Sequence, residues 1–470
     1  MWYEMIKVIS GGMGVYISNP FLTRILSMNG ILGTVSGVAA DKMMSRILQN
    51  GDPGEHFRRA LAHFPLQAAV KQVFDEYFVP GGIPKGTQYK STPATTLKPS
   101  ILAINLLVCA NFAFIWLAKE GHENPVSINY LEKMQLPLIF SIFGAMLAGV
   151  DCISIGAGIA LQVPSVIDSF SKWEEANYRI SVEGGENVSI ETSLNPKLYF
   201  NSKPFELKRP KFLPIVSSDF LASLFLRKNR EGVDGFVVEG PTAGGHNAPP
   251  RGKMVLDQKG EPIYGVRDEV NFAKMRNLGL PFWLGGSCAS PKALKKALGV
   301  GANGIQVGSI FALCEESGMD LKIKREIRKL GFRGELQVKT DVNASPTGFP
   351  FKVADLKGTL SEDVVYRSRK RICDLAGLSI PYLLPNGSIQ FLCPAERIAD
   401  YIRKGGKLEN TQGSRCICNG LTATAGLGNL GEPPIVTLGD DVSFLPHLMK
   451  EECSSYTAKE AIDYLVSLSV

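Results

Sequence analysis

Short apolar runs alternate with longer amphipathic segments along the first two thirds of the chain, and most of these runs end in small or polar residues. Apolar runs of this length are typical of strands buried on both faces of a parallel sheet, and the segments between them have the periodicity of covering helices. The expected strands are 7–10, 31–37, 101–107, 151–158, 212–218, 235–239, 281–287 and 304–309.

Eight strands that alternate with helices predict an α/β fold, a (β/α)8 TIM barrel within residues 1–318. The stretch 173–211 has paired glycines, several prolines and no helical period, which predicts an insertion after the fourth strand. A small hairpin, 178–182 with 188–192, is expected inside it. Residues 319–470 lack the barrel period and are expected to form a mainly helical extension packed on the barrel.

The sixth expected strand leads into a loop in which two glycines, Gly244 and Gly245, precede His246. In parallel α/β folds the loops at the carboxyl ends of the strands carry the functional groups. Imidazole titrates near neutral pH, which suits acid–base work. His246 is therefore the candidate catalytic residue, and the alternative is a structural histidine whose hydrogen bonds are satisfied within the loop.

Other strand ends predict ligand contacts. Gly11 and Gly12 follow the first strand and would let backbone approach a flat ligand. Turns with free N–H groups at the ends of the last two strands form an anion site, although their glycines can also serve only tight turns. The residues of this expected phosphate clamp are Gly285, Gly286, Gly308 and Ser309. Asn105, in the expected third strand, can either cap a helix or hydrogen-bond a ligand.

Composition changes this picture little. A hydrophobic fraction of 45% with 20% charged residues is ordinary for a soluble globular enzyme, and the net charge is +6. The basic cluster 367–371 is interpreted as a solvated helix face, so no nucleic-acid partner is expected. The apolar stretch 135–163 is interrupted by Pro137 and Asp151, which favours a buried helix and strand over a membrane span.

The nine cysteines include one closely spaced pair, Cys416 and Cys418, and no Cys-x-x-Cys motif. Zinc sites in proteins usually contain such motifs. We therefore expect no metal site. Reduced thiols in apolar surroundings are typical of a cytosolic protein, so a cytoplasmic location is expected.

Four motifs, in this order, carry a family resemblance: Gly-Gly-Met-Gly at 11–14, Ala-Gly-Gly-His at 243–246, Leu-Gly-Gly at 284–286 and the strand with its exit at 304–311. Over about residues 5–318 the chain resembles the FMN-dependent nitronate monooxygenases, also called 2-nitropropane dioxygenases, and among them a longer branch. The pattern is shared with the flavin enoyl-acyl-carrier-protein reductases.

The resemblance implies an FMN in the barrel mouth. Gly12 and Met13 would line the isoalloxazine ring and Asn105 would hydrogen-bond it, while Gln306 would lie near the phosphate clamp. Gly11, Gly244 and Gly245 are further expected cofactor contacts. His246 would act on the substrate, as a base for neutral nitroalkanes or as a donor to an anionic nitronate. The flavin and O2 would convert the nitronate to a carbonyl compound and nitrite, with no metal.

Two other functions stay open. One is a flavin reductase that moves hydride from NAD(P)H to an enoyl thioester, for which an acyl-carrier protein would be the partner. The other is a non-catalytic flavin- or phosphate-binding barrel. For a nitronate monooxygenase, the expected partners are a small-molecule substrate and O2, with a homodimer allowed and no nucleic acid or membrane.

Overall fold

The computed structural model describes residues 5–185, 188, 190–201 and 205–467. Within them, eight parallel strands form one sheet in the order β1-β10-β9-β8-β7-β4-β3-β2. A parallel bridge between Ile9 and Leu32 connects β1 to the segment that enters β2, and Ser10 N donates to Leu32 O at 3.0 Å. The sheet thus closes into a (β/α)8 barrel, as predicted. Its strands are β1 (Val8–Ser10), β2 (Gly33–Ser36), β3 (Val126–Leu131), β4 (Cys152–Gly156), β7 (Lys211–Val216), β8 (Phe236–Glu239), β9 (Phe282–Gly285) and β10 (Gly304–Val307).

The strand expectations were correct except for the third. Residues 101–107 begin a 19-residue helix, α5 (Ile101–Lys119), and the third barrel strand is β3. A short apolar run fits a strand and a buried helix equally well, and only its length separates them. The run continues without a break to Lys119, and the Ser100 hydroxyl accepts from Ala103 N at 3.2 Å as an N-cap. The expected strand was therefore the first two turns of a helix.

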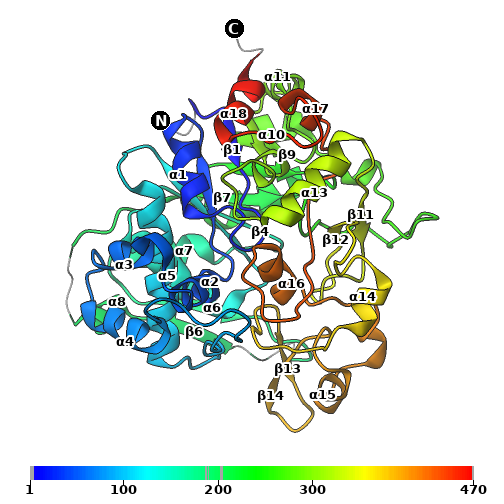
Figure 1. The fold of residues 1–470 in the computed structure, drawn as a ribbon. Helices are drawn as coiled ribbons and strands as arrows, with labels where there is room; N and C mark the ends of the chain where they lie inside the picture. Colours follow the sequence, from blue (N-terminus) through cyan, green and yellow to red (C-terminus); the bar gives the residue numbers. More distant parts are fainter. Residues whose placement is uncertain (1–4, 186–187, 189, 202–204, 468–470) are drawn as a thin grey trace.

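Helix α5 is packed among other helices instead of lying on the surface (Figure 1). By length and apolar content it is the one helix among the described residues that could cross a membrane, and 78% of its apolar window is buried inside the fold. This burial explains why α5 lacks a polar stripe. Its neighbours are α1 (Pro20–Met28), α2 (Ala40–Gln49), α3 (His56–Leu61), α4 (Gln67–Tyr77) and α6 (Gln135–Leu147).

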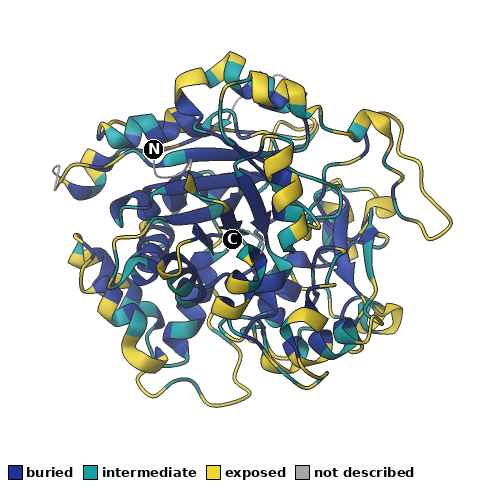
Figure 2. Cartoon of the chain, turned by 90° about the horizontal axis from the view of Figure 1, so that it is seen from above, coloured by how far each residue is buried: buried dark blue, intermediate teal, exposed yellow. Residues whose placement is uncertain are grey.

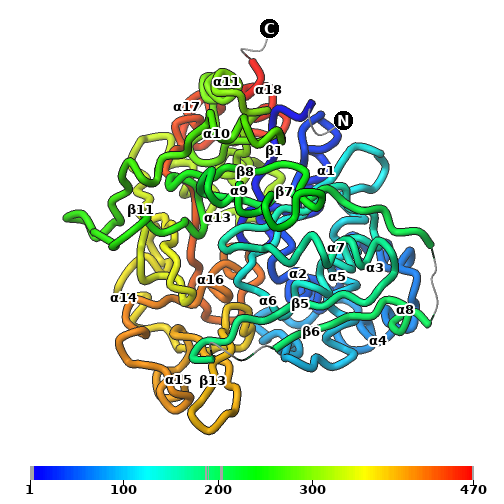
Figure 3. Tube along the Cα trace, turned by 180° about the vertical axis from the view of Figure 1, so that it is seen from behind, coloured from blue at the N-terminus to red at the C-terminus, as the bar shows by residue number. Residues whose placement is uncertain are grey.

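The outer helices surround the buried strands, which lie at the centre when the molecule is seen from above (Figure 2). The last described helix, α18, packs against both α1 and α11, and Figure 3 shows the three together at one end of the molecule. The chain therefore returns to the barrel after the extension, and α18 occupies the place between the helices that follow β1 and β9. The helices on this outer layer that have not yet been given bounds are α7 (Val163–Ser171), α9 (Asp219–Asn229), α10 (Phe272–Asn277), α11 (Pro291–Gly299) and α18 (Ala458–Val466).

The insertion after β4 contains the expected hairpin. Strands β5 (Ala176–Ile180) and β6 (Ile190–Leu194) pair antiparallel, and the short helix α8 (Pro196–Phe200) follows. The alternating buried and exposed side chains of β5 show that one face packs on the protein and the other faces solvent. Parts of the expected insertion, 186–187, 189 and 202–204, lie outside the described residues.

The segment between β10 and α18 contains two antiparallel hairpins that the sequence did not predict, beside short helices (Figure 1). One residue of the basic cluster, Arg369, is also not solvated as expected: its side chain is 4% exposed and pairs with Glu432 at 2.5 Å. The elements are α12 (Ser309–Ala312), α13 (Leu321–Phe332), β11 (Val338–Asp341), β12 (Phe351–Ala354), α14 (Asp363–Ser368), β13 (Ile380–Leu383), β14 (Ile389–Leu392), α15 (Ile398–Arg403), α16 (Ile417–Thr424) and α17 (Leu445–Leu448).

Gly144 on α6 tests the close contact between α5 and α6. A Cβ at this position would overlap Val108 O on α5. We expect Gly144→Ala to lower the free energy of unfolding by about 1–3 kcal/mol, because two packed backbones would have to separate. Urea unfolding followed by circular dichroism measures this. Gly299→Ala, at the end of α11, meets nothing within 4 Å and should be neutral or stabilising by up to about 1 kcal/mol. Equal stability of the two variants would contradict the close packing.

Candidate functional site

A cavity of about 410 Å³ lies at the carboxyl ends of the barrel strands. Its wall includes the exits of β1, β8, β9 and β10, together with residues 375–381 and 437–439 of the extension. In (β/α)8 barrels this end carries the functional loops, because each strand delivers its following loop to the same rim. The cavity is therefore built partly from the barrel and partly from the segment inserted before α18.

Most residues expected to bind a cofactor or substrate lie together in the wall of this cavity. They are Gly11, Gly12, Met13, Gly244, Gly245, His246, Gly285, Gly286, Gln306, Gly308 and Ser309. They come from four loops that are far apart in the sequence, and the barrel brings them to one place. Their individual roles remain predictions.

Asn105 is the exception, and its expected place in the site was wrong. It lies on α5, donates to Gln72 Oε1 at 2.7 Å and accepts from the Tyr199 hydroxyl at 2.8 Å. It does not line the cavity, because the strand assumed to carry it is a helix outside the barrel. The asparagine that lines the cavity is Asn129 on β3, whose Oδ1 is buried without a partner among the described residues.

Asn129 and the first glycine loop lie in close contact. A Cβ on Gly12 would overlap Asn129 Cβ, so only glycine fits at this position. The Ser18 hydroxyl holds the same loop by accepting from Met13 N at 3.0 Å and donating to Gly11 O at 2.9 Å. The loop is thus fixed and places backbone and the Met13 side chain at the cavity.

The exits of β9 and β10 present a group of free backbone donors. Among the described residues, the N–H groups of Gly286, Ser287, Gly308 and Ser309 donate to no protein acceptor. Gly286 has a φ of +95°, and a Cβ there would lie 2.9 Å from Thr242 Oγ1, so the turn requires glycine. N–H groups gathered in this way form an anion site.

His246 faces the cavity from the loop after β8 and touches the extension. Its Nε2 lies 2.7 Å from Ser345 Oγ, and its ring meets the edge of Phe351 at a centroid distance of 4.8 Å. Burial, followed by the positive charge of Lys133, lowers the pKa of His246 to about 4. The imidazole is therefore neutral at pH 7.

Glu239 is the last residue of β8 and also lines the cavity. Its carboxyl group has no salt bridge or side-chain hydrogen bond among the described residues, and burial raises its pKa to about 8. The side chain is thus mostly protonated at pH 7 and can donate a hydrogen bond. Burial raises the pKa of Glu239 and lowers the pKa of His246, so both side chains are mainly neutral at pH 7.

The extension holds the His246 loop from two sides. Gly245 N donates to Thr437 Oγ1 at 2.7 Å, and Asp440 N donates to Thr242 O at 3.1 Å. From the other side, Lys352 N donates to Gly245 O at 2.9 Å, and its buried ammonium pairs with Asp440 at 2.6 Å. The position of the histidine consequently depends on residues more than a hundred positions later in the chain.

Three residues of this site were not predicted from the sequence: Asn129, Glu239 and Ser345. The segment of Asn129 alternates β-branched or aromatic with polar residues, a strand signal that was available. Glu239 stood in the sixth expected strand but was not assigned a role. Ser345 carries no local signal, because its contact with His246 arises only from the fold.

Fold and site together define a (β/α)8 barrel with a glycine-lined cavity, free backbone donors at its last two strands and a neutral histidine. Residues 200–347, which include β7 to β10, match the sequence model of the nitronate monooxygenase family. A probable nitronate monooxygenase from Bacillus subtilis (strain 168) is 33% identical over 122 residues, which cover 26% of this chain and 33% of that protein. The resemblance to the nitronate monooxygenase family is thereby confirmed, and the aligned segment spans about a third of that relative's length.

Two solved structures match over most of the chain, at low scores. FabK from Thermotoga maritima has a TM-score of 0.49 at 14% identity, with 98% of this chain and 92% of FabK covered. The nitroalkane oxidase from Streptomyces ansochromogenes has a TM-score of 0.42 at 12% identity, with 98% and 95% covered. At these scores both likenesses are weak, and no chemistry of this chain follows from them.

The depressed pKa of His246 has a measurable consequence for stability. Its folded value of about 4 lies below its unfolded value of about 6.5, so the unfolded chain binds more protons between these values. The contribution of His246 to the free energy of unfolding is therefore fully present above about pH 6.5, and it is lost as the pH falls toward 4. In cofactor-free protein, His246→Gln should flatten the rise of unfolding free energy across this window. The exposed His447 provides the control His447→Gln, which should keep the wild-type slope; an unchanged slope in His246→Gln would contradict the shift.

Proposed function

We propose that the chain is a flavin-dependent oxidoreductase that holds FMN in the barrel cavity and oxidises alkyl nitronates with O2 to carbonyl compounds and nitrite. The observation that carries this proposal is the group of free N–H donors at Gly286, Ser287, Gly308 and Ser309, beside a glycine-lined wall. Such donors fit the phosphate of a flavin mononucleotide. The confirmed family resemblance supports the choice of substrate class.

The residues present fit the cofactor. Gly285, Gly286, Gly308 and Ser309 would hold the phosphate, with Gln306 nearby. Gly11, Gly12 and Met13 would lie against the ring system. Asn129 would take the role first expected for Asn105, because its Oδ1 has no partner among the described residues and could accept from an N–H of the ring. FMN, when bound, supplies the redox chemistry and the reaction with oxygen.

The state of His246 favours an anionic nitronate over a neutral nitroalkane. An imidazole with a pKa of about 4 is a weak base for removing a proton from carbon, since a general base works best with a pKa near the operating pH. The same neutral ring can donate a hydrogen bond to a nitronate oxygen. Lys133 adds positive charge close to it, and the protonated Glu239 does not repel an anion.

An anaerobic experiment tests the activity. The purified yellow protein receives either an alkyl nitronate or NADPH, and the visible flavin absorbance is followed. We expect bleaching by nitronate alone and nitrite after air is admitted, with bleaching slowed about 10²-fold in His246→Ala because a donor to the substrate is lost. His447→Ala is the matched control. Rapid bleaching by NADPH without nitronate turnover would instead indicate a reductase, and a colourless protein that takes up no FMN would end the proposal.

A second experiment tests the flavin site without turnover. In Gly12→Ala the added methyl group overlaps Asn129, so we expect FMN to bind at least about tenfold more weakly, equivalent to about 1.4 kcal/mol. Quenching of FMN fluorescence measures the dissociation constant. Gly240→Ala is the control, because its Cβ would meet nothing nearer than Gly285 O at 3.7 Å. If both variants bound FMN with equal affinity, the flavin ring would not lie against Gly12.

A further inference from the structure

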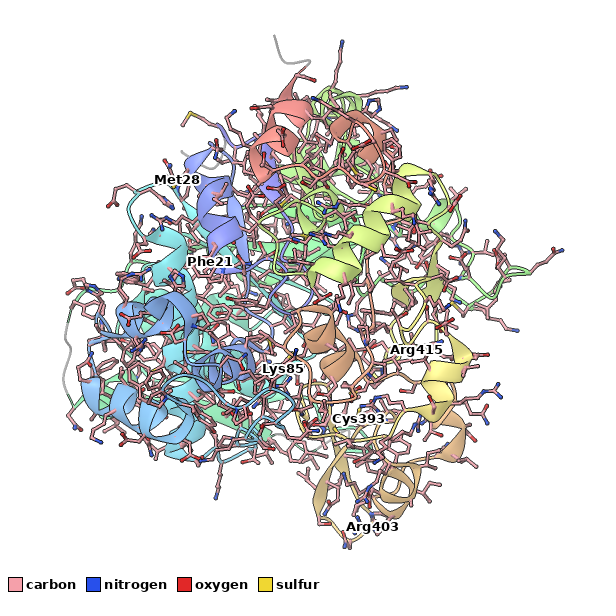
Figure 4. All side chains as sticks on the ribbon, in the orientation of Figure 1. Phe21, Met28, Lys85, Cys393, Arg403 and Arg415 are labelled. Atoms are coloured by element: carbon pink, nitrogen blue, oxygen red, sulfur yellow. The ribbon has the colours of Figure 1, made fainter. Side chains whose placement is uncertain are left out.

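Four of the nine cysteines meet in the extension. Cys393 and Cys416 pack with Ala395, and Cys373 and Cys418 pack against this group. Cys373 precedes β13, Cys393 directly follows β14, and the other two stand at the beginning of α16. Figure 4 labels Cys393 between α16 and the β13–β14 hairpin. All four are free thiols, so no disulfide bond explains why they lie together.

The clustering is a product of the fold. The sequence has no Cys-x-x-Cys motif, and for that reason no metal site was expected. Three separate segments contribute the four cysteines. The other five are not part of the cluster: Cys109, Cys152, Cys288, Cys314 and Cys453.

Backbone donors point at three of the sulfur atoms. The N–H of Ala376 is bonded to Cys373 and the N–H of Asn419 to Cys416, each three residues beyond its cysteine. Cys418 accepts from two N–H groups, those of Gly377 and Leu378. Bonds of this kind stabilise a thiolate, and hydrogen bonds to the sulfurs are one of the means by which proteins tune metal–thiolate centres.

The four thiols lie inside the extension. Cys393 and Cys416 are each 6% exposed, and Cys373 and Cys418 are partly buried against them. A metal centre would replace their protons and use the N–H donors already in place. It would also connect the β13–β14 hairpin to the start of α16, because its ligands come from both.

The arrangement of the ligands distinguishes a single ion from a larger group. Zinc holds each sulfur at about 2.3 Å, which brings four ligands to one point. Among the described ranges, no three Cys, His, Asp or Glu side chains converge in this way. The four thiols nevertheless form one contact group, and the Cys373 and Cys393 side chains are hydrogen-bonded to each other. An iron–sulfur cluster is held by four cysteine thiolates that attach to different iron atoms, so its ligands need not converge on one point.

We propose that Cys373, Cys393, Cys416 and Cys418 ligate an iron–sulfur cluster. Cys418 also lines the main cavity, together with residues 375–381. The cluster would therefore lie against the wall of the proposed flavin site. The cluster assignment rests on the cysteines alone and does not depend on the activity at His246.

The test is a metal and sulfide analysis of the whole chain, produced and purified without oxygen. We expect iron and acid-labile sulfide in equal amounts, about two or four of each per chain, and a paramagnetic signal by electron paramagnetic resonance after reduction with dithionite. Cys416→Ala should lose most of the iron and sulfide. Cys453→Ala, at an exposed cysteine outside the cluster, should retain both.

The metal and sulfide content of the wild-type protein is sufficient to refute the proposal. The test therefore does not depend on whether the cysteine variants fold. Zinc in place of iron, without sulfide, would show a mononuclear site and refute the cluster. Anaerobic protein that takes up neither iron nor sulfide, even after incubation with ferrous iron and sulfide, would refute it as well. Flavin content is measured in the same samples. Loss of the iron–sulfur cluster can then be distinguished from loss of flavin at the barrel cavity.

Discussion

The contact on which the site depends is the close approach of the Gly244–Gly245 turn to residues 437–440. A Cβ on Gly244 would lie 2.8 Å from the Leu438 carbonyl carbon, and the turn is tied to the extension through Thr437 Oγ1. A single barrel loop would be free to move over the mouth. Here the two segments hold each other, and the neighbouring His246 receives a fixed position and a partner, Ser345.

This closure also sets the electrostatics. A histidine and a carboxylic acid that faced water would both change charge within a few pH units of neutrality or below it. Buried in the cavity wall, His246 stays neutral down to about pH 4, and Glu239 stays protonated up to about pH 8. The cavity is thereby suited to hydrogen-bond donation toward an anion more than to proton abstraction. The pKa values thus connect the packing of the extension to the chemistry proposed for the barrel.

The extension is part of the barrel's architecture. It leaves after β10, covers the mouth, assembles the four-cysteine group and returns as α18 between α1 and α11. Barrel closure and mouth coverage are therefore linked through one continuous segment. A metal centre in the extension would stabilise this segment, and through residues 375–381 it would stabilise the cavity wall as well.

Local sequence determined much of this protein. Apolar runs and their glycine exits were sufficient to predict the barrel, seven of its strands and the glycine loops at the cavity, because strand period and turn chemistry are properties of neighbouring residues. The same local information could not separate a strand from the first turns of α5, and it therefore misplaced Asn105 and missed Asn129. Only the tertiary structure decided the pKa of His246, its contact with Ser345 and the meeting of the four cysteines. Each of these depends on burial and on contacts between segments far apart in the chain, which no local pattern encodes.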